Sequence, residues 1–146
     1  MKWPSLCMLS CWCIGLATWA AEPACTPAAD ITPAMLVGTW RIDWSDGARQ
    51  RGEAPWMLTL APHPEYEGSL KGHLSRGAER HEVAADWDDD TLTMEESDDG
   101  QHISATWQAT ATDGQCGREL RGLRFTGAEA GADARRFRMR VLAGSP

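Results

Sequence analysis

Apolar and polar residues alternate over eight short segments of this chain, and glycine, proline and aspartate residues separate the segments. Alternation with a period of two is typical of β-strands that bury one face, and no helical repeat of about 3.6 residues persists beyond residue 36. The expected strands cover about 37 to 45, 55 to 61, 66 to 75, 80 to 87, 91 to 96, 101 to 110, 117 to 126 and 134 to 142. This pattern predicts an all-β chain.

The breaks between the expected strands are short, so successive strands are expected to be antiparallel neighbours. Eight such strands expose two sheet edges unless the sheet closes on itself. We therefore predict an eight-stranded antiparallel up-and-down barrel, with a two-sheet sandwich as the alternative. Thr32 and Pro33 occupy the N-cap and the first position of one short helical turn over 32 to 36, just before the first strand.

The first 20 residues have the features of a secretory leader. Lys2 supplies a positive charge, Leu6 to Ala20 is an apolar run, and Thr18-Trp19-Ala20 is a small-x-small cleavage site. The expected organisation is a signal peptide over 1–20, a tail rich in alanine and proline over 21–31, and a single barrel domain over 32–146. After Ala20 no apolar stretch approaches the roughly 20 residues of a spanning helix. We expect a periplasmic or secreted protein without a membrane span.

Two cysteines, Cys25 and Cys116, remain after the leader is removed. In an exported chain an even pair most simply forms one disulfide, which would tie the N-terminal tail to the far end of the domain.

Charge is distributed unevenly along the chain, whose formal net charge is −7. Ten acidic residues and no lysine or arginine lie between Glu82 and Asp113, whereas seven arginines lie between Arg118 and Arg140. The negative balance argues against nucleic acid as a partner. The two regions are either solvated faces of opposite sign or a surface that steers a charged partner.

Alternation also predicts which side chains point into the barrel. Large rings interspersed with glycine and alanine suit a tapering interior. The expected inward set is Trp40, Ile42, Trp44, Trp56, Leu58, Leu60, Tyr66, Gly68, Leu70, Gly72, Leu74, His81, Val83, Ala85, Trp87, Leu92, Met94, Ile103, Ala105, Trp107, Leu123, Phe125, Phe137, Met139 and Val141.

The segment Leu36-Val37-Gly38-Thr39-Trp40, a helical turn leading into G-x-W, resembles the opening motif of the calycin superfamily of lipocalins and avidin-like barrels. The resemblance implies that Trp40 lies at the closed end of the barrel, covered by Arg138 or Arg140 from the last strand. Arg41-Ile42-Asp43 stand where avidin-like barrels carry their biotin-binding residues, so biotin binding is not implied. Small barrels that inhibit secreted metalloproteases are similar in size and leader, although their disulfide joins early strands.

Motifs for metal or catalytic chemistry are missing from the sequence. Asp86, Asp88 and Asp90 form D-x-D-x-D, but Thr91 and Ser97 replace the glycine and glutamate that a calcium loop requires at its sixth and twelfth positions. The four histidines lack a close ligand spacing, and no nucleophile elbow or phosphate loop occurs. We expect no metal, no cofactor and no enzymatic activity.

Five tryptophans follow the leader, and the meander divides them between the two ends of the barrel. Trp44, Trp56, Leu74 and His81 are expected at one rim, the open mouth, with Met94, Phe125 and Phe137 nearby. Tyr66 and three tryptophans, Trp40, Trp87 and Trp107, are expected towards the other end. The rings form either a solid aromatic core or a shallow aromatic pocket surrounded by the open-end loops.

These features predict an exported, non-enzymatic binding protein that inhibits or neutralises another exported protein through the open-end loops. Arg49, Arg51, Asp98 and Asp99 are the candidate partner contacts on those loops. The alternative is a carrier that holds a small apolar or aromatic ligand at Trp44, Trp56 and His81. A small hydrolase is the third class.

Overall fold

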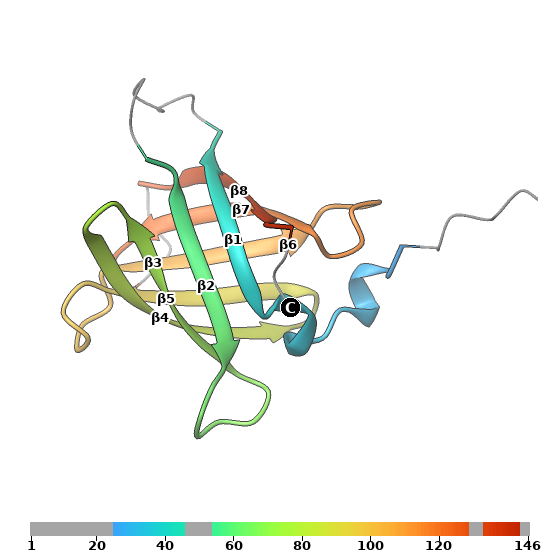
Figure 1. The fold of residues 1–146 in the computed structure, drawn as a ribbon, viewed down its shortest axis with the longest axis horizontal. Coiled ribbons are helices and arrows are strands. Elements are labelled where there is room, and N and C mark those ends of the chain that lie inside the picture. The colour runs from blue at the N-terminus through green and yellow to red at the C-terminus, as the bar shows by residue number, and fades with distance from the viewer. Residues whose placement is uncertain (1–24, 46–53, 129–132, 144–146) are drawn as a thin grey trace, which may run out of the picture.

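A computed structural model describes residues 25–45, 54–128 and 133–143 of the chain. Eight antiparallel strands follow one another in chain order, and β8 pairs with β1 to close the barrel (Figure 1). The strands are β1 (Gly38–Trp44), β2 (Trp56–Pro62), β3 (Leu70–Arg76), β4 (Glu79–Asp88), β5 (Thr91–Ser97), β6 (Ala105–Ala111), β7 (Glu119–Thr126) and β8 (Arg135–Val141). The predicted all-β up-and-down barrel is confirmed, and closure removes the sandwich alternative.

Two 3-10 turns precede the barrel, η1 (Ala28–Asp30) and η2 (Pro33–Leu36). The second is the helical turn expected at 32 to 36, and the Met35 amide donates to the Thr32 carbonyl at 2.9 Å. The predicted leader, residues 1 to 20, lies outside the described residues. Within the residues that the structure describes, no helix is long and apolar enough to cross a membrane.

Most inward assignments follow the observed alternation, but three residues placed on strands lie in loops. Tyr66 and Gly68 belong to the β2–β3 connection, where Tyr66 is 63% exposed and Gly68 has a φ of 86°. Ile103 precedes β6 and is 37% exposed. Each segment was predicted to start too early, because the apolar side chains of Tyr66 and Ile103 extended the alternation into loop residues.

The inward face of β7 is the opposite of the predicted one. Arg124 pairs in register with the inward Trp107, and Leu120 pairs with the inward Met139. Leu123 and Phe125 therefore lie on the outer side of the strand, although Phe125 is buried there, and Leu120, Gly122 and Arg124 line the interior. Because β7 has apolar residues at both parities, its sequence does not favour either face.

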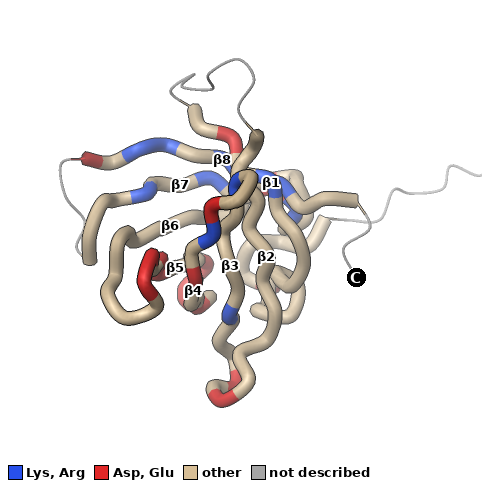
Figure 2. The backbone as a smooth tube through the Cα atoms, turned by 60° about the vertical axis from the view of Figure 1, so that its left-hand side comes forward, with Lys and Arg blue, Asp and Glu red and all other residues tan. Residues whose placement is uncertain are grey.

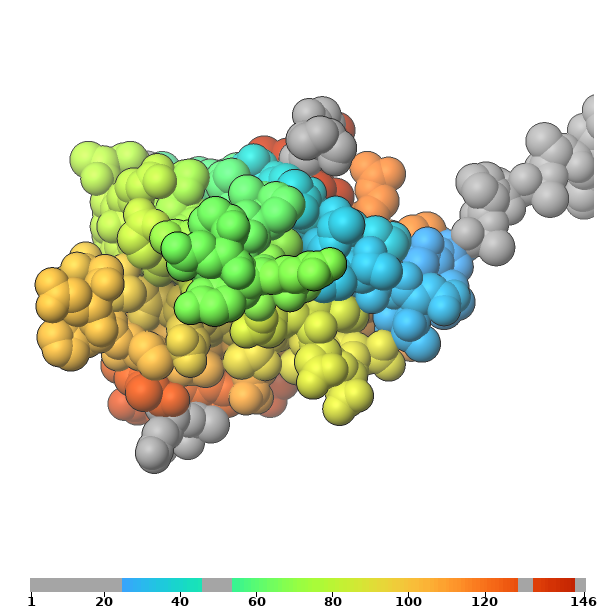
Figure 3. All heavy atoms as spheres, turned by 90° about the horizontal axis from the view of Figure 1, so that it is seen from below, coloured from blue at the N-terminus to red at the C-terminus, as the bar shows by residue number. Residues whose placement is uncertain are grey.

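The closed end of the barrel is sealed by the N-terminal segment. Trp40 has no exposed surface, and its indole N–H donates to the Leu36 carbonyl at 2.9 Å. A disulfide joins Cys25 to Cys116, 91 positions apart, as predicted. In Figure 3 the N-terminal segment, in blue, lies against one end of the molecule.

Arg138 and Arg140 do not take the position over Trp40 that the calycin resemblance implies. Arg138 pairs in register with Asp43, and Arg140 pairs with Arg41, on the outer face of the sheet. There the Arg140 guanidinium bonds to the Asp43 carboxylate at 2.9 Å. The side chains alternate with the inward Phe137, Met139 and Val141, so they cannot point to the interior.

The outer surface carries the charge asymmetry of the sequence. Figure 2 shows lysine and arginine concentrated along β7 and β8, with acidic residues around β4 and β5. On the basic side, the Glu119 carboxylate forms an ion pair with Arg121 Nη2 at 2.8 Å, and its other oxygen lies 4.0 Å from Arg138 Nε. Acidic side chains are thus interspersed among the arginines of this face.

Candidate binding site at the open end of the barrel

The open end gathers side chains from all eight strands. The C-terminal ends of β1, β3, β5 and β7 meet the N-terminal ends of β2, β4, β6 and β8 at one rim. A cavity of about 180 Å³ lies at this rim. Its lining consists of Trp44, Trp56, Leu74, Arg76, Glu79, His81, Glu96, Trp107, Arg124 and Arg135. The structure thus brings together the predicted Trp44, Trp56 and His81 and adds a set of charged residues.

Two of the rings that line this cavity, Trp44 and Trp107, pack against each other and against Phe137. The ring centroid of Trp107 lies 5.5 Å from that of Trp44 and 4.8 Å from that of Phe137. Trp107 was expected near the other end of the barrel, and that expectation is wrong. Because β6 begins at Ala105, Trp107 lies one inward step from the open rim.

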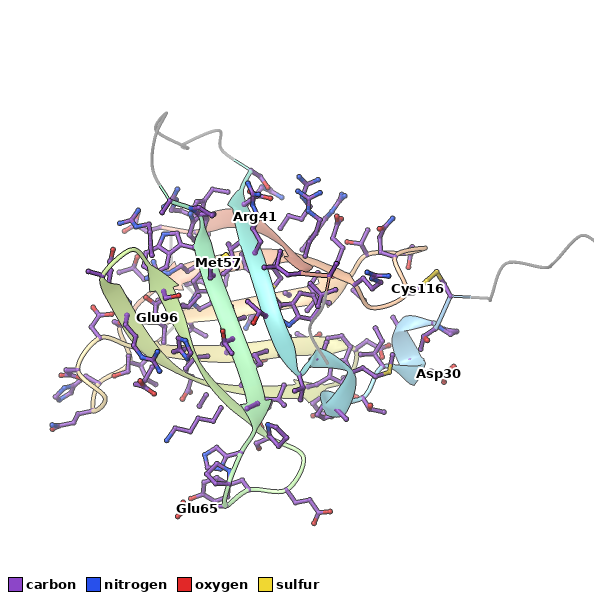
Figure 4. All side chains as sticks on the ribbon, viewed as in Figure 1. Asp30, Arg41, Met57, Glu65, Glu96 and Cys116 are labelled. Carbon is purple, nitrogen blue, oxygen red and sulfur yellow. A yellow bond between two sulfur atoms is a disulfide. The ribbon has the colours of Figure 1, made fainter. Side chains whose placement is uncertain are left out.

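A buried carboxylate lies beside these rings at the end of β5. Glu96 is only 2% exposed, and it continues the inward series of Leu92 and Met94. One carboxylate oxygen accepts from the Trp107 indole at 2.8 Å and from Arg124 Nε at 2.9 Å. The other accepts from Arg124 Nη2 at 3.1 Å and lies 2.7 Å from His81 Nδ1. Figure 4 shows Glu96 and Cys116 towards opposite ends of the barrel.

These contacts determine the ionisation of Glu96. Burial by itself would raise the pKa of the carboxyl group, but the hydrogen bonds and positive charge of Arg124, with the hydrogen bonds of Trp107 and His81, hold the pKa below its ordinary value. The carboxylate is therefore charged at neutral pH. It holds Arg124, Trp107 and His81 in fixed positions around the cavity.

Among the described residues at the open end, three arginines lie over the rings of three tryptophans. The guanidinium carbon of Arg135 lies 4.1 Å from the ring centroid of Trp44, and that of Arg76 lies 4.7 Å from Trp56. The third pair is Arg124 with Trp107, at 5.4 Å. A cation in this position is attracted to the electron-rich face of the ring.

Asp98 and Asp99, two of the predicted partner contacts, form hydrogen bonds within the β5–β6 connection. Asp98 lies 2.8 Å from His81 Nδ1 and accepts from the Ser104 hydroxyl at 2.8 Å. Asp99 accepts from the backbone amides of Gln101 and His102, both at 2.8 Å. Both aspartates therefore stabilise the local chain. Arg49 and Arg51, the other predicted contacts, lie outside the described residues.

His81, Glu96 and Asp98 also place three potential metal ligands within 4.8 Å of one another. Both Glu96 oxygens, however, already accept hydrogen bonds from Arg124. A cation at Glu96 would have to compete with a guanidinium bound through two nitrogens. The arrangement fits a hydrogen-bonded cluster around Glu96 better than a metal centre.

The cavity lining includes residues that were not predicted from the sequence, among them Arg76, Glu96, Arg124 and Arg135. For Glu96 a signal exists, because extending the alternation of Leu92 and Met94 by one step places a carboxylate inside the barrel. Arg124 has no comparable signal, since its inward orientation depends on the register of β7 with β6.

Comparison of the chain with protein-family models, with curated proteins and with solved structures finds no match. Inference about function therefore rests on the open end itself.

Proposed function

We propose that this chain is an exported, non-enzymatic binding protein that inhibits or neutralises another exported protein through the open end of its barrel. The observation that carries this proposal is the preformed cavity at that end, where Trp44, Trp56 and Trp107 combine with three arginines. Aromatic rings and arginines are the side chains most enriched at the centres of protein interfaces.

The size of the cavity favours a protein side chain as its occupant. Below the rim, the interior is filled by buried side chains, among them Ile42, Leu58, Met94 and Met139. The cavity of about 180 Å³ is smaller than the roughly 300 to 1,000 Å³ of pockets that enclose whole ligands. A single side chain projecting from a partner fits this volume, and the rim would contact the surface around it.

Two further features support the compartment and the absence of catalysis. The Cys25–Cys116 disulfide suits an oxidising environment outside the cytoplasm, in line with the leader predicted over 1 to 20. Glu96 is hydrogen-bonded through both oxygens and its pKa is lowered, whereas a general acid or base is tuned towards neutral pH.

The test compares partner capture by the mature chain and two aromatic variants. Proteins retained from the exported fraction are identified and purified, and the dissociation constant of each binary complex is measured. Trp56→Ala should weaken the complex at least tenfold. Tyr66→Ala, which removes an exposed ring at the opposite end, should leave the dissociation constant within about twofold. Equal binding by the parent chain and Trp56→Ala would exclude the open end as the interface.

The second candidate is a carrier of a small apolar or aromatic ligand, which the shared lining of Trp44 and Trp56 favours. Native mass spectrometry of the protein from its own compartment distinguishes the two functions. A small mass lost on denaturation, together with no effect of Trp56→Ala on any protein complex, would support the carrier.

A further inference from the structure

The charged groups at the open end differ in what they still offer to a ligand. Glu96 uses both oxygens for Arg124, Trp107 and His81. Glu79 accepts from Arg76 Nη2 at 2.9 Å with one oxygen, and the other lies 3.2 Å from His81 Nε2. Both carboxylates that line the cavity are thus engaged by donors of the protein itself.

The rings of Trp44 and Trp56 each have one face covered by an arginine of the protein itself. Arg135 covers a face of Trp44 at 4.1 Å, and Arg76 covers a face of Trp56 at 4.7 Å. A cationic ligand usually gains affinity from a carboxylate or from the face of an aromatic ring. At this rim it would find guanidinium groups already in those positions.

Arg124, by contrast, has more N–H groups than it uses for its hydrogen bonds to Glu96. A guanidinium carries five N–H groups, and Arg124 directs its Nε and one Nη2 hydrogen at Glu96. Three N–H groups of this arginine are left, and no contact between them and another carboxylate occurs within the described residues. The Arg124 side chain is about three-quarters buried, where a bond to an anion is stronger than at the surface.

We infer that the open end recognises a carboxylate attached to a flat apolar group and discriminates against cations. The carboxylate would bond to the remaining donors of Arg124, and the flat group would lie among Trp44, Trp56 and Trp107. This inference rests on the proposed function, because the group would come from the partner as an aromatic side chain with a carboxylate beside it, either at the chain end or on a neighbouring aspartate. A ring with one carboxylate is within the volume of about 180 Å³.

Three probes of one shape and different charge test the inference. Benzoate is an anion, benzamide is neutral and benzamidine is a cation, while all three share the same ring. Their dissociation constants are measured by calorimetry and by the indole N–H signals of the mature chain. Benzoate should bind at least tenfold more tightly than benzamide, and benzamidine should bind most weakly. Equal affinities, a preference for benzamidine, or no detectable binding of benzoate would overturn the inference.

Charge variants locate the group responsible. Glu96→Gln keeps a side chain of similar shape but removes the charge that offsets Arg124, so benzoate affinity should rise several-fold. Arg124→Gln should abolish the preference for benzoate over benzamide. The double variant Glu96→Gln/Arg124→Gln leaves no unpaired buried charge and should show the same loss while remaining folded. Arg121→Gln, on the outer face, should leave all three affinities unchanged. Unaltered discrimination in the double variant would contradict the role of Arg124.

Short ligands identify the source of the carboxylate. N-acetyl-phenylalanine presents a terminal carboxylate beside a ring, and its amide serves as the neutral control. A peptide amide with an internal Phe-Asp pair presents a side-chain carboxylate instead. Tighter binding of the first ligand indicates a chain end or a free acid, and tighter binding of the peptide indicates an acidic side chain. If Trp56→Ala weakens a protein complex while benzoate binds no more tightly than benzamide, this inference fails and the proposed function stands. If benzoate binds more tightly than benzamide while Trp56→Ala leaves every protein complex unchanged, only the proposed function fails.

Discussion

The indole N–H groups of buried tryptophans find different hydrogen-bond acceptors at the two ends of this barrel. At the closed end, the Trp40 indole bonds to the Leu36 carbonyl four positions earlier in the chain. At the open end, the Trp107 indole bonds to Glu96, whose charge is compensated by Arg124 from a third strand. The closed end thus uses a neutral local bond, whereas the open end uses an ion pair that exists only after β5, β6 and β7 have assembled.

This difference assigns separate roles to the two ends. A neutral bond with complete burial contributes to stability at little desolvation cost. A buried ion pair contributes less net stability because both charges lose hydration, but it fixes the positions of the groups around it. The closed end should therefore govern stability, and the open end should govern recognition.

Removal of the disulfide should give the largest change in stability. Cys25 and Cys116 are 91 positions apart, and the chain-entropy relation gives about 4 to 5 kcal/mol for closing such a loop. The double variant Cys25→Ser/Cys116→Ser should lose about that amount in a denaturant titration. Its benzoate affinity should match that of the parent under conditions where both are folded. A loss of binding by the folded variant would show that the two ends are coupled.

Substitution of Trp40 should cost about 3 to 5 kcal/mol, as expected when a fully buried large side chain becomes alanine. Trp56 is partly exposed and packs at the rim, so Trp56→Ala should cost only about 1 to 2 kcal/mol. Denaturant unfolding of both variants gives the comparison. Equal costs would mean that the two ends are equally important for stability.

Breaking the Glu96–Arg124 pair on one side should cost about 3 kcal/mol, because Arg124→Leu leaves a buried carboxylate without its cation. Glu96→Leu/Arg124→Leu should recover most of this loss, which a double-mutant cycle measures. A double variant as unstable as the single one would show that packing, and not the uncompensated charge, causes the loss.

The lowered pKa of Glu96 also predicts a pH dependence. A carboxylate with a lowered folded pKa contributes stability above its unfolded pKa of about 4.5, and the contribution is lost as pH falls through the folded pKa. Unfolding free energies of the parent chain should therefore decrease below about pH 4.5 more steeply than those of Glu96→Gln. Parallel curves for the two proteins would contradict the pKa shift.

The smallest effects concern two histidines on the outside of the barrel, the exposed His102 and the half-buried His73. Hydrogen bonding and the negative charge of Asp99 raise the pKa of His102, whereas burial and the positive charge of Arg80 lower the pKa of His73. NMR titration of the imidazole signals should place His102 above 6.5 and His73 below it. In Asp99→Asn the His102 value should return towards 6.5, with His73 unchanged as the control.

Much of the architecture could be predicted from the sequence. The number of strands, their antiparallel order and the closed barrel follow from alternation and short turns. The same pattern brought Trp44, Trp56 and His81 to one rim. Errors occurred where alternation was ambiguous, as at Tyr66 and Ile103, whose apolar side chains lie in loops.

The chemistry of the open end required the tertiary structure. Leu120, Leu123 and Phe125 give β7 apolar residues on both faces, so only its register with β6 and β8 orients Arg124 inward. The starting point of β6 likewise decides that Trp107 lies near the open rim.

The sequence determined what depends on neighbouring residues and on the period of a strand: eight antiparallel strands, a helical turn before Trp40 and the pairing of Cys25 with Cys116. The tertiary structure decided what depends on several strands at once. Glu96 becomes a buried, fully bonded carboxylate only when Trp107 and Arg124 arrive from other strands. The physical reason is that a one-residue change in strand parity moves a side chain from one face of the sheet to the other.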